Sequence, residues 1–332
     1  MNDRIKKSFA LALAMTALAI AISPAMVSTA AGGNDRPYVL TTIEVPGATI
    51  TQAYGINAGG DIVGSYNDAA GSHGFLLSAG EFTSLDYPSD NVLSTVATAI
   101  GPSGDIVGIY SLKSPASAGN AHGFLRTKEG EWATVDYPVG NHLMQGGLYS
   151  ILTDGTMLGC FHDGTATTTT AMYGYVAYPD GATSEFDYPA DKPFAMFYGA
   201  TPNGKTIVGA YRTGTGPAIH WHGYLLDNRG MTTLDVPGSV LTQAYSINPA
   251  GETVGTYTAL NPDGTTGMHG FLVETRGLAA GNWQFTTVDF PGAIMTHVRG
   301  INAGSDLVGD YIIVGGDGKA QVKGFVASRP GR

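Results

Sequence analysis

The chain has little cysteine and little charge. Cys160 is the single cysteine, so no intramolecular disulfide can form, although an oxidising compartment remains compatible with the sequence. Because Cys160 sits in the apolar stretch 157–161, we expect a buried structural thiol and not a nucleophile. Only 13% of residues are charged, and 17 Lys and Arg face 27 Asp and Glu. An acidic chain of this kind is a poor partner for nucleic acid or an anionic lipid surface.

The chain also has few long apolar runs. The run Phe9–Ile22 follows the basic residues Arg4, Lys6 and Lys7, and its 14 residues fall short of the roughly 20 that span a bilayer. We interpret residues 1–30 as a signal peptide cleaved after Ala30, which predicts a secreted or periplasmic protein. A retained membrane anchor is the alternative. Removal of residues 1–30 changes the net charge from −10 to −12.

Glycine is abundant, with 48 residues in 332, and it belongs to a repeat. A core (G/A/S)-I-N-x-x-G-x-x-V-G-x-Y is followed by a loop, an H-G-F-L segment and an (L/V)-D-(Y/F/V)-P strand. Spacings of 44 to 54 residues between copies, each with several short strands, indicate the blades of a β-propeller. The second glycine of the core recurs at Gly64, Gly108, Gly159, Gly209, Gly255 and Gly309.

Each copy predicts four short strands. In the first copy these are A (52–56), B (61–66), C (73–77) and D (82–87), the last of which ends at Pro88. The innermost strand of a propeller is crowded, so we expect strand A to carry small residues next to the conserved Ile position. Small residues stand there in every copy: Gly55, Ala99, Ser150, Ala200, Ser246 and Gly300.

The ends of the chain are in complementary phase. Residues 38–46 form a D strand without A, B or C before it, and residues 323–327 form a C strand without D after it. The N-terminal strand can therefore complete the last blade and remove two open sheet edges. We predict an all-β, six-bladed β-propeller, closed by its N-terminal strand, as a single domain over residues 31–332. An open β-solenoid is the alternative.

The cores, such as 55–64, each followed by a His-Gly-Phe-like segment, resemble the extracellular repeats named for a His-Ala-Phe (HAF) signature. The resemblance covers nearly all of residues 38–327 and implies a secreted repeat protein. This chain has Gly where the signature has Ala, and Tyr173 and Lys323 replace the histidine in two copies. The family is largely uncharacterised, so the resemblance implies no catalytic residue.

Two recurring polar positions suggest structure and not chemistry. Equivalent residues of different blades lie too far apart to share a metal, so we expect no metal site and no cofactor. An acidic residue present in every copy also cannot be an asymmetric catalytic pair. Hydrogen bonds within or between blades explain both positions better. The histidines are His73, His122, His222 and His269; the acids are Glu44, Asp86, Asp136, Asp187, Asp235 and Asp289.

Ligand-binding residues are expected where the copies differ. The loops between D and A and between B and C are longer and more variable than the A–B turns, so their face is the predicted ligand face. His297 and Arg299 depart most from the repeat, although packing between blades is the alternative for them. Lesser candidates are His142, Asp191, His162 and Asp163. The predicted binding residues, near the start of each A strand, are Gln52, Tyr54, Tyr149, Phe197, Gln243, Tyr245, His297 and Arg299.

Three functions fit these features. The first is a non-enzymatic binding module for a carbohydrate, a small molecule or a protein partner, favoured by the lack of any catalytic motif. The second is a secreted hydrolase or lyase acting on a polysaccharide or ester, with His297 as base and Arg299 as electrostatic stabiliser. The third is a structural protein of a surface or matrix.

Overall fold

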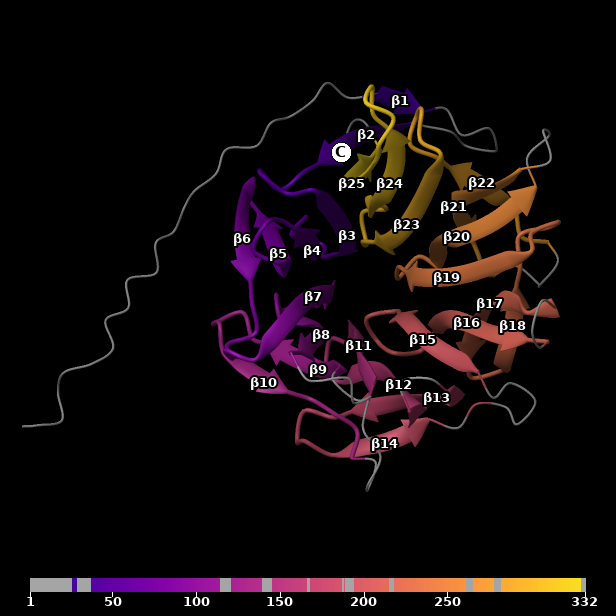
Figure 1. Ribbon diagram of the computed structural model, residues 1–332. Helices are drawn as coiled ribbons and strands as arrows, with labels where there is room; N and C mark the ends of the chain where they lie inside the picture. The colour runs from indigo at the N-terminus through magenta and orange to yellow at the C-terminus, as the bar shows by residue number, and fades with distance from the viewer. Residues whose placement is uncertain are drawn as a thin grey trace, which may run out of the picture.

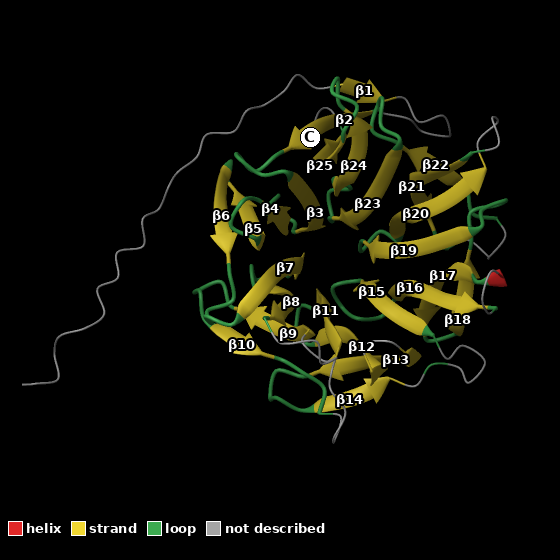
Figure 2. Ribbon diagram, in the orientation of Figure 1, coloured by secondary structure: helices red, strands yellow, loops and turns green. Residues whose placement is uncertain are grey.

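A computed structural model describes residues 26–28, 37–113, 121–138, 145–165, 168–186, 188, 194–214, 218–260, 265–277 and 282–329. Apart from a short helical turn at Ala218, these residues form strands joined by turns and loops, so the fold is all-β (Figure 2). The predicted signal peptide lies outside these ranges except for residues 26–28, which form β1 (Met26–Ser28). Within the described ranges, no helix has the length and apolar character needed to cross a membrane.

The strands pair in antiparallel groups of four that follow the predicted A, B, C, D order. The first group is β3 (Ile50–Ile56), β4 (Ile62–Asn67), β5 (Ser72–Ser78) and β6 (Glu81–Leu85). The next are β7 (Val92–Ile100), β8 (Ile106–Leu112), β9 (Ala121–Arg126) and β10 (Trp132–Thr134), and then β11 (Gln145–Ile151), β12 (Met157–Thr165), β13 (Thr168–Ala177) and β14 (Thr183–Phe186). They are followed by β15 (Ala195–Ala200), β16 (Ile207–Thr213), β17 (His220–Asp227) and β18 (Gly230–Leu234), and by β19 (Leu241–Ile247), β20 (Glu252–Leu260), β21 (Thr266–Glu274) and β22 (Phe285–Val288).

The last group combines the two ends of the described chain. β23 (Met295–Ile301), β24 (Leu307–Val314) and β25 (Ala320–Ser328) pair in order, and β2 (Tyr38–Ile43) pairs antiparallel with β25 as the outer strand. Leu40 of β2 is 1% exposed and packs in one apolar cluster with Phe325 of β25 and Leu272 of the preceding group. β1 in turn pairs with β2.

The groups lie around a common centre, with the first strand of each group innermost (Figure 1). Each innermost strand contacts the next one along the chain, and β23 contacts β3. Single parallel residue pairs also link neighbouring groups, for example Ser72 with Ser94 and, between the last and first groups, Val322 with Ile50. This arrangement is a β-propeller-like fold.

Close packing requires the second glycine of the repeat core, which lies two residues before the aromatic residue of strand B. A Cβ at Gly64 would lie 2.0 Å from the Gln52 carbonyl oxygen and 2.6 Å from the ring of Phe75, which is fully buried. The same clash with an A-strand carbonyl and a C-strand aromatic ring recurs in the other groups, at Gly108, Gly159, Gly209, Gly255 and Gly309.

In four groups the recurring histidine and acid form a pair inside the sheet. His73 Nδ1 lies 2.7 Å from Asp86 Oδ1, and the His73 ring stacks on Tyr66 with a centroid distance of 5.1 Å. In the last group Lys323 pairs with Glu44 instead. The geometry agrees with a structural role for both positions; Asp187 lies outside the described residues. The equivalent pairs are His122 with Asp136, His222 with Asp235 and His269 with Asp289.

Candidate functional site

A β-bulge at the same place in each innermost strand directs one side chain towards the central axis. In β3, Ala53 pairs with Gly64 and Gly55 with Val63, so Tyr54 between them is left out of the ladder. A bulge re-aims the side chain of the extra residue, and bulges are common beside binding sites. The six bulge residues are Tyr54, Thr98, Tyr149, Tyr198, Tyr245 and Arg299.

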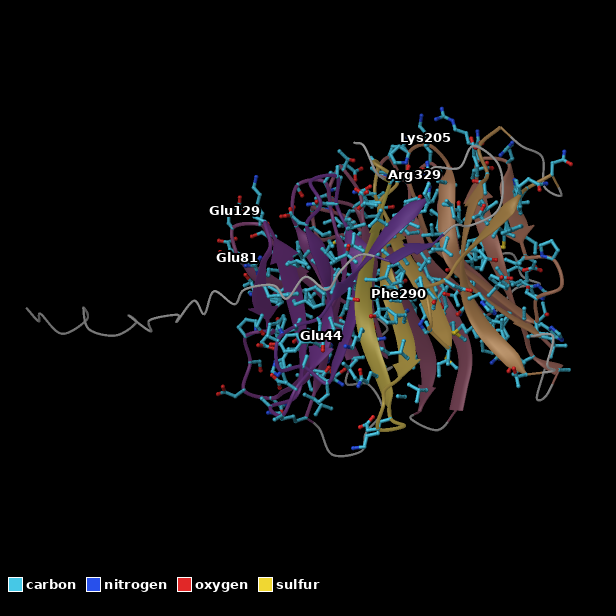
Figure 3. The ribbon with its side chains drawn as sticks, turned by 90° about the horizontal axis from the view of Figure 1, so that it is seen from above. Glu44, Glu81, Glu129, Lys205, Phe290 and Arg329 are labelled. Carbon is cyan, nitrogen blue, oxygen red and sulfur yellow. The ribbon has the colours of Figure 1, made fainter. Side chains whose placement is uncertain are left out.

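The bulge residues line an axial cavity with a volume of about 150 Å³. The cavity wall continues from them into the A–B turns, which join the first and second strands of each group. We call the end of the molecule that carries these turns the turn face; Lys205, in one A–B turn, points outward there in the view of Figure 3. Besides the bulge residues, the lining includes Ile56, Ile100, Ile151, Ile247, Ile301, Pro102, Pro202, Pro249, Asn57, Asn248 and Asn302.

Asparagines hold the mouth of the cavity in place. Asn248 Nδ2 donates to the Asn302 carbonyl at 3.2 Å, and Asn302 Nδ2 donates to the Asn57 carbonyl at 3.2 Å. The recurring Asn of the I-N motif therefore ties neighbouring A–B turns together. The asparagine contacts at this rim are polar, whereas the isoleucines that precede the turns are apolar.

Arg299 is held by a buried carboxylate. Its Nε donates to Asp310 Oδ1, and Asp310, 1% exposed, also lies 2.7 Å through Oδ2 from His297 Nδ1. Burial is the largest single influence and disfavours the charged guanidinium, but Asp310 together with Tyr54 and Tyr245 outweighs it and raises the Arg299 pKa above its ordinary value. Burial likewise opposes the Asp310 carboxylate, yet Arg299 and then His297 hold its pKa below the usual range. Both residues are therefore charged at neutral pH.

Two tyrosines flank the same guanidinium. The Arg299 Cζ atom lies 4.9 Å from the ring centroid of Tyr54 and 5.6 Å from that of Tyr245, both within cation–π range. Burial raises the pKa of both phenols, so they are neutral hydrogen-bonding groups.

Glutamines behind the tyrosines fix the phenol groups. Tyr54 Oη donates to Gln52 Oε1 at 3.3 Å, and Tyr245 Oη donates to Gln243 Oε1 at 2.8 Å. Gln243 Nε2 donates to Tyr198 Oη at 3.3 Å. The ring of Tyr198 also meets those of Tyr245 and Tyr149, with centroid distances of 4.9 and 6.0 Å. Tyr149, Tyr198 and Tyr245 thus form one connected aromatic surface, and Arg299 lies between the rings of Tyr245 and Tyr54.

The structure brings most of the predicted binding residues together. Tyr54, Tyr149, Tyr245 and Arg299 line the cavity. Gln52 and Gln243 support the tyrosines from behind the lining. His297 joins Arg299 only through Asp310, and its Nε2 faces Met268 Sδ at 2.7 Å instead of the cavity.

The prediction of Phe197 as a binding residue is wrong. Phe197 is fully buried and packs with Leu158 and Cys160, whereas its neighbour Tyr198 is the bulge residue. The A–B turn of this group closes from Thr201 to Thr206 and is one residue longer than the turn from 57 to 61, so a fixed spacing from Gly209 misaligns the strand. Side chains alternate along a strand, and a shift of one residue exchanges core for cavity. The residues Gly199 and Ala200, aligned with 55 and 56, would have identified Tyr198.

The cavity lies at the turn face, whereas the sequence favours the face with the D–A and B–C loops. On the inner side of those loops there is a second hollow of about 130 Å³, lined by apolar residues that include Met172, Met196 and Cys160. His142 and Asp191 lie outside the described residues, as do the side chains of His162 and Asp163. Across the described part of the chain, no three His, Cys, Asp or Glu residues gather as metal ligands would.

Comparisons with known proteins bear on the fold. No protein-family model matches the chain, and no curated protein sequence matches it. A solved protein of unknown function from Dyadobacter fermentans DSM 18053 is similar to 87% of this chain and 98% of its own, with 13% identity and a TM-score of 0.53. Pyrococcus horikoshii acylaminoacyl peptidase is similar over 90% of this chain and 48% of its own, with 14% identity and a TM-score of 0.49. Polysaccharide lyase Uly1 is similar over 97% of this chain and 91% of its own, with 14% identity and a TM-score of 0.47. At such identities, the Dyadobacter structure supports the fold alone.

Proposed function

We propose that the chain is a secreted, six-bladed β-propeller in which β2 completes the last blade. The pairing of β2 with β25 and the contact between β23 and β3 support this proposal. Closure of this kind leaves no innermost strand without a neighbour. The HAF-like repeats and the basic, apolar N-terminal segment support secretion.

The proposed function is that of a non-enzymatic binding module that takes a small ligand, either a carbohydrate or a small organic molecule, in the axial cavity. The observation that carries this proposal is the bulge in every innermost strand, which places four tyrosines, Thr98 and Arg299 on one cavity wall. Aromatic rings provide stacking faces, and the phenols and the guanidinium provide directional hydrogen bonds.

The position of His297 favours binding over hydrolysis or elimination. A general base must reach the proton that it removes, at about 2.6–3.2 Å or through one water. His297 Nδ1 is occupied by Asp310 and Nε2 faces Met268 Sδ, so neither nitrogen reaches the axial cavity. The hydrolase or lyase alternative therefore lacks a histidine or carboxylate base among the residues that line this cavity, and burial raises the pKa of the lining tyrosines.

A ligand screen on residues 31–332 tests the proposal. The thermal-shift panel holds oligosaccharides and small aromatic compounds, and a ligand at 100 times its Kd adds about 2.7 kcal/mol of stability. Ala58 is exposed at the cavity mouth, so Ala58→Trp should block binding without disturbing the core. Ala70→Trp, in an exposed B–C loop, is the matched control. Hits that survive Ala58→Trp would place the binding site elsewhere.

A further inference from the structure

Arg299 is the one charged side chain that lines the axial cavity within the described residues. Asp310, its counter-ion, is 1% exposed and is not part of the lining, so a ligand meets the guanidinium and not the carboxylate. We propose that the ligand carries a carboxylate that Arg299 binds. This inference rests on the proposed function and names the chemical class of the ligand.

The geometry orients the guanidinium before a ligand arrives. Asp310 holds Nε, and the rings of Tyr54 and Tyr245 lie within cation–π distance of the guanidinium carbon. Contacts with aromatic faces leave the edge of a planar guanidinium for in-plane acceptors. A carboxylate matches that edge with two parallel N–H···O bonds, which a neutral hydroxyl cannot reproduce.

The repeat shows that the fold does not need a charge at this place. The other five bulge residues are uncharged, and the cross-strand pair behind them is Gln52 with Ser65 in the first group and Gln243 with Thr256 in the fifth. In the last group, the equivalent cross-strand pair is His297 with Asp310. A buried ion pair is often no more stabilising than the uncharged residues that could replace it. The charges in this group are therefore explained by recognition better than by stability.

The cavity limits the size of the acid. A volume of about 150 Å³ accommodates roughly one benzene-sized ring. Isoleucines, prolines and tyrosines surround this volume, while the phenols of the tyrosines offer polar partners. An aromatic acid and a sugar acid both meet these conditions, since each carries one carboxylate on one ring.

The repeat also supplies a variant that should fold. Removal of Arg299 alone would take away the guanidinium that pairs with the buried Asp310 carboxylate and would leave it with His297. The triple variant H297Q/R299Y/D310T instead gives the last group the residues of the fifth, Gln243, Tyr245 and Thr256. Circular dichroism and thermal unfolding verify its fold. The binding probes are benzoate against benzamide and glucuronate against glucose, measured by calorimetry on wild type and variant.

We expect benzoate or glucuronate to bind wild type about 10- to 100-fold more tightly than its neutral counterpart, the value of one charge-assisted hydrogen-bonded contact. The triple variant should lose this preference. R299K, which keeps the charge but not the planar fork, should retain only part of it. Which acid binds distinguishes an aromatic from a sugar ligand.

Equal affinity for acids and their neutral counterparts in wild type would overturn the carboxylate proposal and leave the binding module standing. An acid preference that persists in the folded triple variant would also overturn it. If none of the four probes binds, the carboxylate proposal fails, whereas the binding module is then decided separately by the wider panel and Ala58→Trp.

Discussion

Lys323 Nζ lies 3.0 Å from Glu44 Oε2, and this contact joins β25 to the residue that directly follows β2. The pair occupies the position of the His–Asp pairs in four other groups, so the substitution changes both partners together. Because Glu44 directly follows β2 and lies far from Lys323 in the sequence, this contact helps set the register of β2 on β25. The sheet formed by β2 and β25 therefore has a polar side-chain pair at the same repeat position as those four groups.

Deletion of β2 should unfold or aggregate the protein. A chain that begins after residue 45 loses Leu40, which is 1% exposed, and leaves the edge of β25 unpaired. An exposed edge of this kind pairs with other chains. Size-exclusion chromatography and thermal unfolding compare it with a chain that begins at residue 37. Equal melting temperatures and monomeric elution for both chains would contradict a stabilising role for β2.

Gly64→Ala should destabilise the fold. The added methyl group would lie 2.0 Å from the Gln52 carbonyl oxygen, which cannot move without breaking the β3–β4 ladder, and overpacking of this kind costs about 1–3 kcal/mol. Gly316→Ala is the control, because nothing lies within 4 Å of the added atom. Urea denaturation measures both variants. If Gly64→Ala matched the control, the crowding argument for the recurrent glycine would be refuted.

Much of the fold could be predicted because the repeat states it many times. The strand order, the complementary ends and the His–acid positions all follow from local patterns that recur in each copy. The register of β15 did not follow, since one additional residue between Thr201 and Thr206 is invisible when copies are aligned at constant spacing. Hydrogen bonding, and not sequence spacing, fixes where that turn closes.

The site was predicted in its residues more than in its location. Variation among copies indicated Arg299, and the structure places this residue in the lining of the axial cavity, at a position that is uncharged in the other copies. Loop length, however, favoured the opposite face from the axial cavity. The cavity depends on bulges, and the one-residue offset of a bulge is not encoded by the alternation that identifies strands. Asp310 was missed because its position in strand B follows no repeat pattern. The equivalent residues in the other copies are Ser65, Ile109, Cys160, Ala210 and Thr256.

Phe197→Ala and Tyr198→Phe should separate stability from binding. Phe197 is fully buried, so its truncation should cost about 3–5 kcal/mol of unfolding free energy. Tyr198→Phe keeps the ring and removes only the hydroxyl that accepts from Gln243, so it should weaken binding of a hit ligand with little change in melting temperature. Calorimetry and thermal unfolding provide the two readings. If Phe197→Ala mainly weakened binding and Tyr198→Phe mainly lowered the melting temperature, Phe197 and not Tyr198 would face the cavity.

Cys160 should resist alkylation in the folded protein. Burial is the main cause that raises the pKa of its thiol to about 12, so almost no thiolate is present at pH 8. The thiol also lies 3.0 Å from the Phe197 amide nitrogen inside the core. Mass spectrometry after iodoacetamide treatment should find an unmodified native protein and full modification in urea. Rapid native alkylation would show that the neighbouring hollow admits reagent to the sulfur.

Acid should remove a stabilising contribution from Asp310. Although burial opposes its charge, Arg299 and His297 lower the Asp310 pKa in the folded state below the unfolded value of about 3.9. Stability from a carboxylate with a lowered pKa is present above the unfolded pKa and is lost as the pH falls through the folded pKa. The triple variant H297Q/R299Y/D310T lacks this carboxylate. Urea denaturation between pH 5 and 2.5 should therefore show wild type losing stability faster than the variant. If both lose it in parallel, Asp310 does not titrate with folding, and its contact with Arg299 contributes no pH dependence to the fold.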